Sequence, residues 1–196
     1  MHLGRRFLQL ASLVACGLVV ALATSARDAS AQAAGGTIVV NVVADGAPAK
    51  AEVVVKTATA EARQVATGKA GAPIAVPDGT YDVDVTCTEM LDHPVQNLRG
   101  VKVAGAPVSR DVSFVAGTTT LNITKGGKAL RGTTIKLRKV GGDELPVAAK
   151  SGEAFRSSPG NYEAEVVFGQ GKAKATHSIT GIQVYDGAKR TIPVQL

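Results

Sequence analysis

The stretch VPDGTYDVDV, residues 76–85, returns near the end of the chain as SSPGNYEAEV, residues 157–166. In both stretches a turn signal with proline and glycine precedes a segment that contains alternating apolar and polar residues. In Greek-key β-sandwiches a tyrosine at such a corner packs along the core and donates a hydrogen bond to the backbone. We therefore predict a structural corner in each stretch. Its residues are Gly79, Tyr81, Gly160 and Tyr162.

The duplication extends over most of the chain. Residues 36–42 (GTIVVNV) align with residues 117–123 (GTTTLNI), and residues 98–103 (LRGVKV) align with residues 179–184 (ITGIQV). One unit of about 80 residues therefore occurs twice, which is too few copies for a solenoid. Each unit is expected to bury its own core.

Both units are predicted to consist of β-strands. Tyr81, Val83 and Val85 share one face of a strand, and in the second unit Tyr162, Ala164 and Val166 do the same. Clusters of glycine, proline and aspartate interrupt the apolar segments at short intervals, as turns between strands do. The sequence predicts an all-β protein made of two tandem β-sandwiches of about seven strands each. Their expected bounds are residues 34–116 and 117–196.

The first 33 residues have the composition of a secretory signal peptide. Arg5 and Arg6 precede an apolar segment of about 17 residues, which is at the short limit for a membrane span. Small residues follow, and they include cleavage sites at Ala29-Ser30-Ala31 or Ala31-Gln32-Ala33. We expect export with removal of residues 1–33, and no membrane span afterwards. The alternative is a membrane-anchoring helix.

Cys16 belongs to a sequence, LVACG, that is similar to a bacterial lipobox. A lipoprotein acylated at Cys16 is therefore an alternative to a cleaved secreted protein, although the apolar segment continues beyond the cysteine. After cleavage only Cys87 remains, so the exported chain forms no internal disulfide. Its stability must come from the apolar cores.

Two segments of the first unit carry a resemblance to a known family. They are DGAPAKAEVVV, residues 45–55, and VPDGTYDV, residues 76–83. They resemble the pattern G-x-P-x-x-A-x-V-x-V followed by P-x-G-x-Y-x-V of carboxypeptidase-regulatory-like modules in bacterial exported proteins. The second unit departs from this pattern, because Lys128-Ala129-Leu130 lacks the proline. The resemblance implies Ig-like or prealbumin-like sandwiches and an accessory, non-catalytic role beside larger surface or periplasmic machinery.

Few residues suggest catalysis or metal binding. Cys87, Met90 and His93 are close in sequence and include soft ligands that suit copper, but a free cysteine at an inward strand position also serves as a small hydrophobe. Paired carboxylates at residues 82 and 84, and at 163 and 165, suggest either a calcium site or a solvated strand face. The sequence contains no nucleophile elbow and no metalloprotease motif. We expect no enzyme, no cofactor and no bound metal.

The positive charge belongs to the second unit. Residues 37–116 contain 7 Lys and Arg against 9 Asp and Glu, whereas residues 117–196 contain 12 against 6. Such a surface attracts anionic polymers or lipid headgroups. Nucleic acid is not expected, because the chain is exported and outward aromatic residues are scarce. The candidate anion-binding residues are Lys125, Lys128, Arg131, Lys136, Arg138, Lys139, Lys172 and Lys174.

Two leading hypotheses for function follow, and a third is a small metal-binding or catalytic protein centred on Cys87, Met90 and His93. The first is a non-enzymatic structural or protein-interaction module of a bacterial envelope, periplasmic or extracellular, that binds a protein partner through strand edges or loops. The second is a binder of anionic polysaccharide or lipid surfaces through the basic second unit. The sequence identifies neither the partner nor the oligomeric state.

Overall fold

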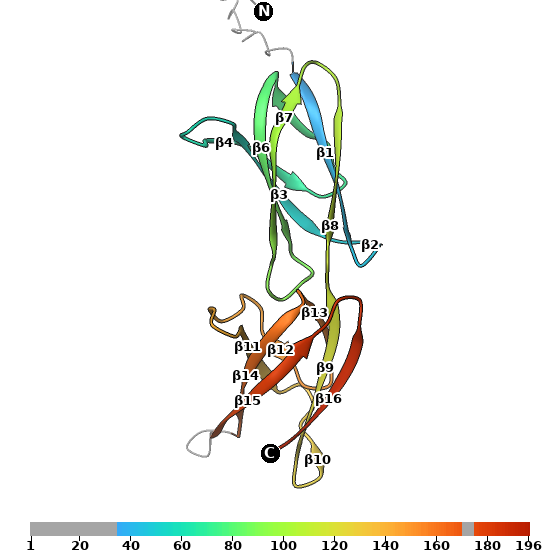
Figure 1. Ribbon diagram of the computed structural model, residues 1–196, viewed down its shortest axis with the longest axis vertical. Coiled ribbons are helices and arrows are strands. Elements are labelled where there is room, and N and C mark those ends of the chain that lie inside the picture. The colour runs from blue at the N-terminus through green and yellow to red at the C-terminus, as the bar shows by residue number, and fades with distance from the viewer. Residues whose placement is uncertain (1–34, 170–174) are drawn as a thin grey trace, which may run out of the picture. The chain divides into compact units, whose positions relative to one another are not determined.

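The computed structural model describes residues 35–169 and 175–196, and within these residues it contains strands and no helix (Figure 1). In the described part of the chain, accordingly, no helix is long and apolar enough to cross a membrane. The expected all-β fold is confirmed for these residues. The proposed signal peptide with Cys16, and Lys172 and Lys174, lie outside the described residues.

The first eight strands form two sheets of four strands. In one sheet β1 pairs antiparallel with β2 and β5 and parallel with β8, and in the other the order is β4-β3-β6-β7. We call this pair of sheets the first sandwich. Its strands are β1 (Gly35–Ala44), β2 (Ala47–Pro48), β3 (Ala51–Thr57), β4 (Gln64–Lys69), β5 (Ile74–Pro77), β6 (Gly79–Cys87), β7 (Val95–Val103) and β8 (Val108–Phe114).

The remaining strands, the second sandwich, repeat this topology. The strand β9 pairs antiparallel with β10 and β13 and parallel with β16, and the other sheet has the order β12-β11-β14-β15. The strands are β9 (Gly117–Lys125), β10 (Lys128–Ala129), β11 (Thr134–Lys139), β12 (Ala149–Lys150), β13 (Ala154–Ser157), β14 (Gly160–Phe168), β15 (Ala175–Val184) and β16 (Lys189–Gln195). Each sandwich thus has eight strands where about seven were predicted. The count includes two-residue strands that pattern reading does not detect.

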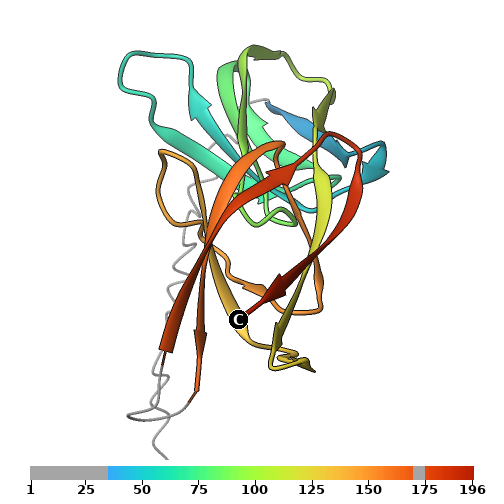
Figure 2. The same cartoon turned by 60° about the horizontal axis from the view of Figure 1, so that its bottom comes forward.

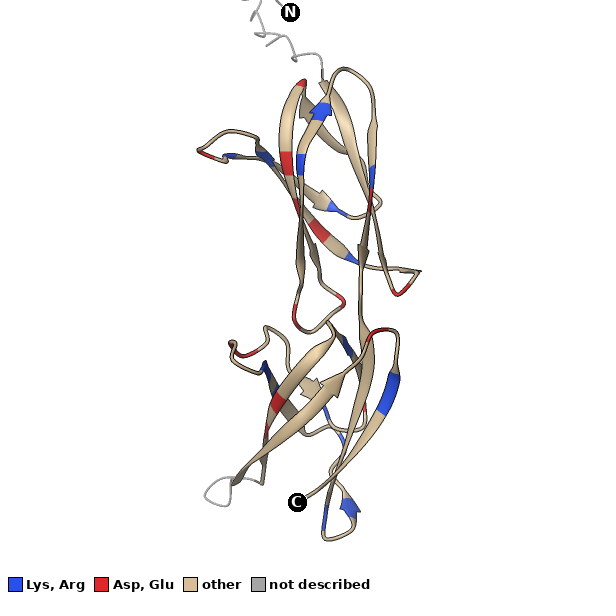
Figure 3. Cartoon of the chain, viewed as in Figure 1, with Lys and Arg blue, Asp and Glu red and all other residues tan. Residues whose placement is uncertain are grey.

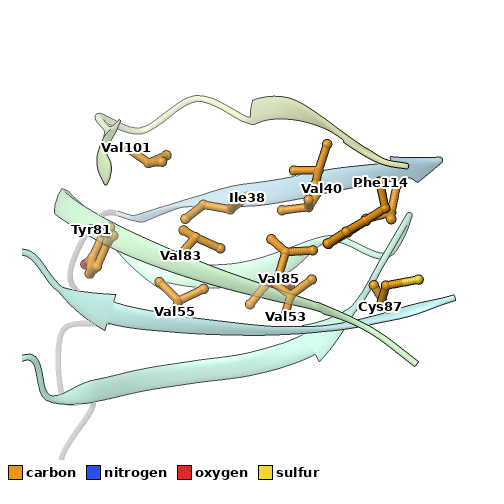
Figure 4. Close-up of a cluster of buried hydrophobic side chains, with 14 of the residues drawn as sticks. Ile38, Val40, Val53, Val55, Tyr81, Val83, Val85, Cys87, Val101 and Phe114 are labelled. Carbon is orange, nitrogen blue, oxygen red and sulfur yellow. The ribbon is translucent and has the colours of Figure 1, made fainter. Parts of the chain in front are cut away.

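Alternation of side chains along the strands produces two hydrophobic cores. Figure 4 shows side chains of β1, β3 and β6 meeting between the sheets of the first sandwich, among them Val40, Val53 and Val85, which are fully buried. Leu121, Ile135 and Val166 are likewise fully buried in the separate core of the second sandwich. Each such side chain contributes roughly 1.5–3 kcal/mol by leaving water. By contact density, residues Ala33–Leu196 nevertheless form one compact unit.

One glycine at the start of each sandwich allows the chain to pack closely against neighbouring backbone. A Cβ atom at Gly117 would lie 2.2 Å from the carbonyl oxygen of Tyr185, and one at Gly36 would lie 2.6 Å from that of Ala106. Real Cβ atoms do not approach backbone oxygens this closely. The aligned glycines at the start of both repeats are therefore required by close packing of the chain.

We expect Gly117→Ala to lower the free energy of unfolding by about 3 kcal/mol, the upper end for inserting a methyl group into packed structure, because backbone must move. Urea unfolding of the wild type and the variant measures the loss. Gly142→Ala is the control, since a Cβ there would lie no closer than 3.4 Å to any neighbour. The control should change stability by less than about 0.5 kcal/mol. Equal losses for both variants would contradict the explanation.

Candidate functional site: the junction between the sandwiches

The turn after β1 binds the segment that connects the two sandwiches. Asp45 and Gly46 both have positive φ, 49° and 73°, as a tight hairpin turn requires. The Asp45 carboxylate accepts a hydrogen bond from the Ala116 N–H at 2.9 Å, and the Asp45 N–H donates to the Phe114 carbonyl at 3.2 Å. Ala116 itself is fully buried. The connecting segment is thus fixed to the first sandwich just before β9 begins.

Arg156, on β13 of the second sandwich, reaches the same turn. Its Nη2 atom donates to the Ala44 carbonyl oxygen at 2.7 Å and lies 3.4 Å from Asp45 Oδ2. Its Nη1 atom lies 3.8 Å from Glu89 Oε2. The side chain is 25% exposed. Because a guanidinium is planar and presents several N–H groups in a fixed geometry, one arginine can bind all three acceptors together.

The loop between β6 and β7 completes the junction. The Leu91 N–H donates to the Arg156 carbonyl at 2.9 Å, and the Asp92 carboxylate accepts from the Ser158 N–H with both oxygens at 3.2 Å. Met90 is fully buried in the first core, whereas its neighbour Leu91 packs against the second core. Adjacent residues of one loop therefore belong to different cores.

The tyrosine of each predicted corner donates a hydrogen bond to a backbone carbonyl four residues before it. The Tyr81 hydroxyl donates to the Pro77 carbonyl at 2.8 Å, and the Tyr162 hydroxyl donates to the Ser158 carbonyl at 2.6 Å. Burial raises the pKa of Tyr162 to about 12, and the negative charge of Asp92 acts in the same direction. Since Asp92 also binds the Ser158 N–H, the second corner is part of the junction.

The cysteine and the methionine considered as metal ligands lie in the first core, and the histidine lies in the loop that follows. Cys87 and Met90 are fully buried in the first core, and His93 lies in the following loop with a positive φ of 41°. Burial raises the pKa of the Cys87 thiol. Among the described residues no group of three or more His, Cys, Asp or Glu is placed to hold a metal ion. Cys87 and Met90 pack as hydrophobic side chains.

The paired carboxylates bind partners on their own sheets. Asp84 accepts from Lys56 Nζ at 2.6 Å, and this hydrogen bond is the main cause that lowers the pKa of Asp84. Asp82 accepts from the Gly100 N–H at 2.9 Å, where a β-bulge interrupts the pairing of β6 and β7. Glu163 accepts from Arg138 Nε at 2.8 Å. These carboxylates stabilise sheet faces and turns.

The described members of the predicted basic set occupy two regions (Figure 3). Lys136 and Arg138 project from β11 beside Glu144 and Glu163, at nitrogen–oxygen distances of 3.1 Å and 2.5 Å, over a hollow of about 500 Å³. Lys125 and Lys128 face each other across the β9–β10 hairpin, in the other sheet. Arg131 follows that hairpin, and Lys139 ends β11. The structure therefore does not gather these residues into one patch.

The junction residues were missed by the sequence interpretation, although the repeat contains a signal for them. Arg156 aligns with Ala75, and Asp45 aligns with Gly126. A residue that differs in charge between two copies of one fold is not required by the fold itself. Such differences point to positions that serve contacts outside their own sandwich.

No protein-family model and no curated protein matches the sequence. Solved structures with some similarity include the minor pilin GBS52 of Streptococcus agalactiae, at 12% identity over 82% of this chain and 94% of the pilin, with a TM-score of 0.38. The shaft pilin SpaA of Lactobacillus rhamnosus GG has 11% identity over 82% of this chain and 97% of the pilin, with a TM-score of 0.38. The TIE protein of Bacillus anthracis has 16% identity over 83% of this chain, with a TM-score of 0.35. This chain spans 33% of the TIE protein's length. Similarities at these TM-scores establish no shared function.

The raised pKa of Tyr162 predicts a loss of stability in alkali. An acid whose pKa is higher in the folded state stabilises that state fully below its ordinary pKa of 10.0, and the contribution is lost as the pH rises through about 12. Near neutral pH we expect Tyr162→Phe to be less stable than wild type by about 1 kcal/mol, the value of one hydrogen bond. The difference should shrink between pH 10 and 12, as followed by urea unfolding. A difference that stays constant over this range would contradict the prediction.

Proposed function

We propose that the chain is a non-enzymatic structural and protein-interaction module of a bacterial cell envelope. In this proposal residues 1–33 are a signal peptide removed during export to the periplasm or the cell surface. Residues 34–116 and 117–196 are two prealbumin-like domains of the carboxypeptidase-regulatory-like kind. The exported pair holds protein partners at a fixed spacing.

The observation that carries this proposal is the junction. Flexibly linked modules need only a polar linker, whereas here the charged side chains of Arg156, Asp45 and Asp92 form contacts between the sandwiches. Hydrogen bonds that involve a charged group contribute about 1.5–3 kcal/mol each. Ala116, in the connecting segment, is buried as well. This set of contacts favours a stiff support over two independently moving modules.

Removing the junction side chains should separate the motions of the sandwiches without unfolding either core. In Arg156→Ala combined with Asp92→Asn, we expect NMR relaxation to give two different rotational diffusion tensors, one for each sandwich. The wild type should give a single tensor for both. The measurement uses backbone amides in the strands of each sandwich.

Arg138→Ala is the matched control, because Arg138 is an arginine of the same sandwich whose partner, Glu163, lies on the neighbouring strand of the same sheet. This variant should keep a single diffusion tensor. A wild type that already shows two tensors would contradict the proposed stiffness. So would a junction variant that still shows one tensor.

A second candidate function, binding of anionic polysaccharide or lipid surfaces, is favoured by one observation. Lys125 and Lys128 are directly opposite each other on β9 and β10, and like charges in this position destabilise a hairpin. Lys125 Nζ lies 4.3 Å from the centroid of the Phe168 ring, which compensates part of the repulsion. An anion at this tip would compensate the rest.

If the hairpin binds anions, the chain should bind vesicles that contain phosphatidylglycerol at low salt and dissociate as salt rises. Lys125→Gln combined with Lys128→Gln should weaken binding at least about fivefold, since each lysine near an anionic surface contributes about 1 kcal/mol. Lys150→Gln combined with Lys189→Gln changes the net charge equally at other strands and is the control. Equal weakening by both pairs would indicate a general charge effect and no site at the hairpin.

A further inference from the structure

The outer strands β7 and β15 occupy equivalent places in the two sandwiches, but only β7 carries charged residues and a side-chain hydrogen bond to the other sheet. Charged residues on an edge strand prevent other strands from pairing with it. The strand β7 contains Arg99 and Lys102, both exposed. In addition, the Gln96 side chain donates to the Ser113 carbonyl at 2.6 Å and so ties β7 to β8 of the other sheet.

None of these features occurs on β15. Arg99 is replaced by Thr180, Lys102 by Gln183, and Gln96 by His177. His177 is exposed, whereas Gln96 is half-buried. The two copies therefore differ at the residues that decide whether an edge accepts another strand.

Figures 1 and 2 show β15 beside β14, and β15 is the last strand of its sheet. It is ten residues long, and residues 175 to 181 are exposed except Ile179, which is partly buried against the second core. Among the described edge strands longer than four residues, it alone has no charged residue (Figure 3). The charged residues on the other edges are Lys69 of β4, Arg99 and Lys102 of β7, Arg110 and Asp111 of β8, and Lys189 and Arg190 of β16.

We infer that β15 is an association edge that pairs antiparallel with β15 of a second copy of this chain. A two-fold axis perpendicular to the sheet relates the copies and joins their four-stranded sheets into one sheet of eight strands. Such an interface uses the same surface on both copies and is closed, so it gives a dimer and no fibre.

The edge is complementary to itself. A perpendicular two-fold axis keeps the outward face of each strand outward, so the outward row of Thr176, Ser178 and Thr180 meets the same row of the second copy. Pairs of threonine and serine across strands stabilise sheets, and no like charges meet. The other long edges of the chain would instead bring the charged residues named above against β15. The strand that fits β15 best is therefore β15 itself.

The length of the pairing is limited by a bulge. The register of β14 and β15 shifts between Tyr162 and Ala164, next to Gly181, which has a positive φ of 73°. Bulges increase the local twist and end regular pairing. We therefore place the intermolecular contact at residues 175–180.

The test introduces into β15 the two positively charged residue types that β7 has at the aligned positions. In the unit Ala33–Leu196, we expect sedimentation equilibrium to show a concentration-dependent dimer. Thr180→Arg combined with Gln183→Lys should raise the dimer dissociation constant at least about tenfold, because the new arginine enters the contact once from each copy and the new lysine adds positive charge just beyond each end of it. The double variant should fold normally, since β7 has these residue types at the same positions. Amides of residues 175–180 should gain hydrogen-exchange protection with protein concentration in wild type only.

The control is Thr191→Arg combined with Gln64→Lys, which adds the same charge on exposed positions of β16 and β4. It should leave the dimer intact. The inference is overturned if the wild type stays monomeric up to about 1 mM, or if the control disrupts a dimer as strongly as the β15 variant. It is also overturned, in favour of a strand from another protein, if an added extended peptide protects the amides of residues 175–180 while the chain stays monomeric.

Discussion

The hydrogen bond from the Arg156 guanidinium to the Ala44 carbonyl oxygen is the contact on which the junction depends. It holds Arg156 where its backbone carbonyl accepts from Leu91, and it places the adjacent Ser157-Ser158 segment within reach of Asp92. The Ser158 carbonyl in turn accepts a hydrogen bond from the Tyr162 hydroxyl. One charged side chain therefore connects the first hairpin turn, the loop that contains Met90 and the second tyrosine corner.

Duplication explains why so much of this molecule is regular and why its exceptions are informative. Both copies have a glycine at the first strand and a tyrosine corner. Both also have a bulge, in the pairing of β6 with β7 and of β14 with β15, next to Gly100 and Gly181. Where no common physical requirement applies, the copies have diverged. The divergent positions include the junction residue Arg156 and the unprotected edge residue Thr180.

Strand alternation and turn composition were sufficient to predict the fold class and the inward residues, because a half-buried strand constrains every second side chain. The buried residues Tyr81, Tyr162 and Cys87 follow this rule. Met90 does not, because it lies in the loop after β6, where no strand alternation indicates which side chains turn into the first core. The ion pair of Lys136 was also missed, since its partner Glu144 comes from a loop whose path no local pattern specifies.

The differences between the two repeats also bear on how two copies of the chain can associate. They disfavour end-to-end contact through the junction residues and leave the lateral contact along β15. The junction requires a carboxylate in the turn after the first strand and an arginine near the tyrosine corner. The second sandwich has Gly126 in that turn, and the first sandwich has Ala75 in place of the arginine. Two copies of the chain therefore lack the groups needed to join end to end through this set of contacts, which serves only the pair within one chain. A sheet edge needs only backbone groups and the absence of charge, and these conditions are met along β15.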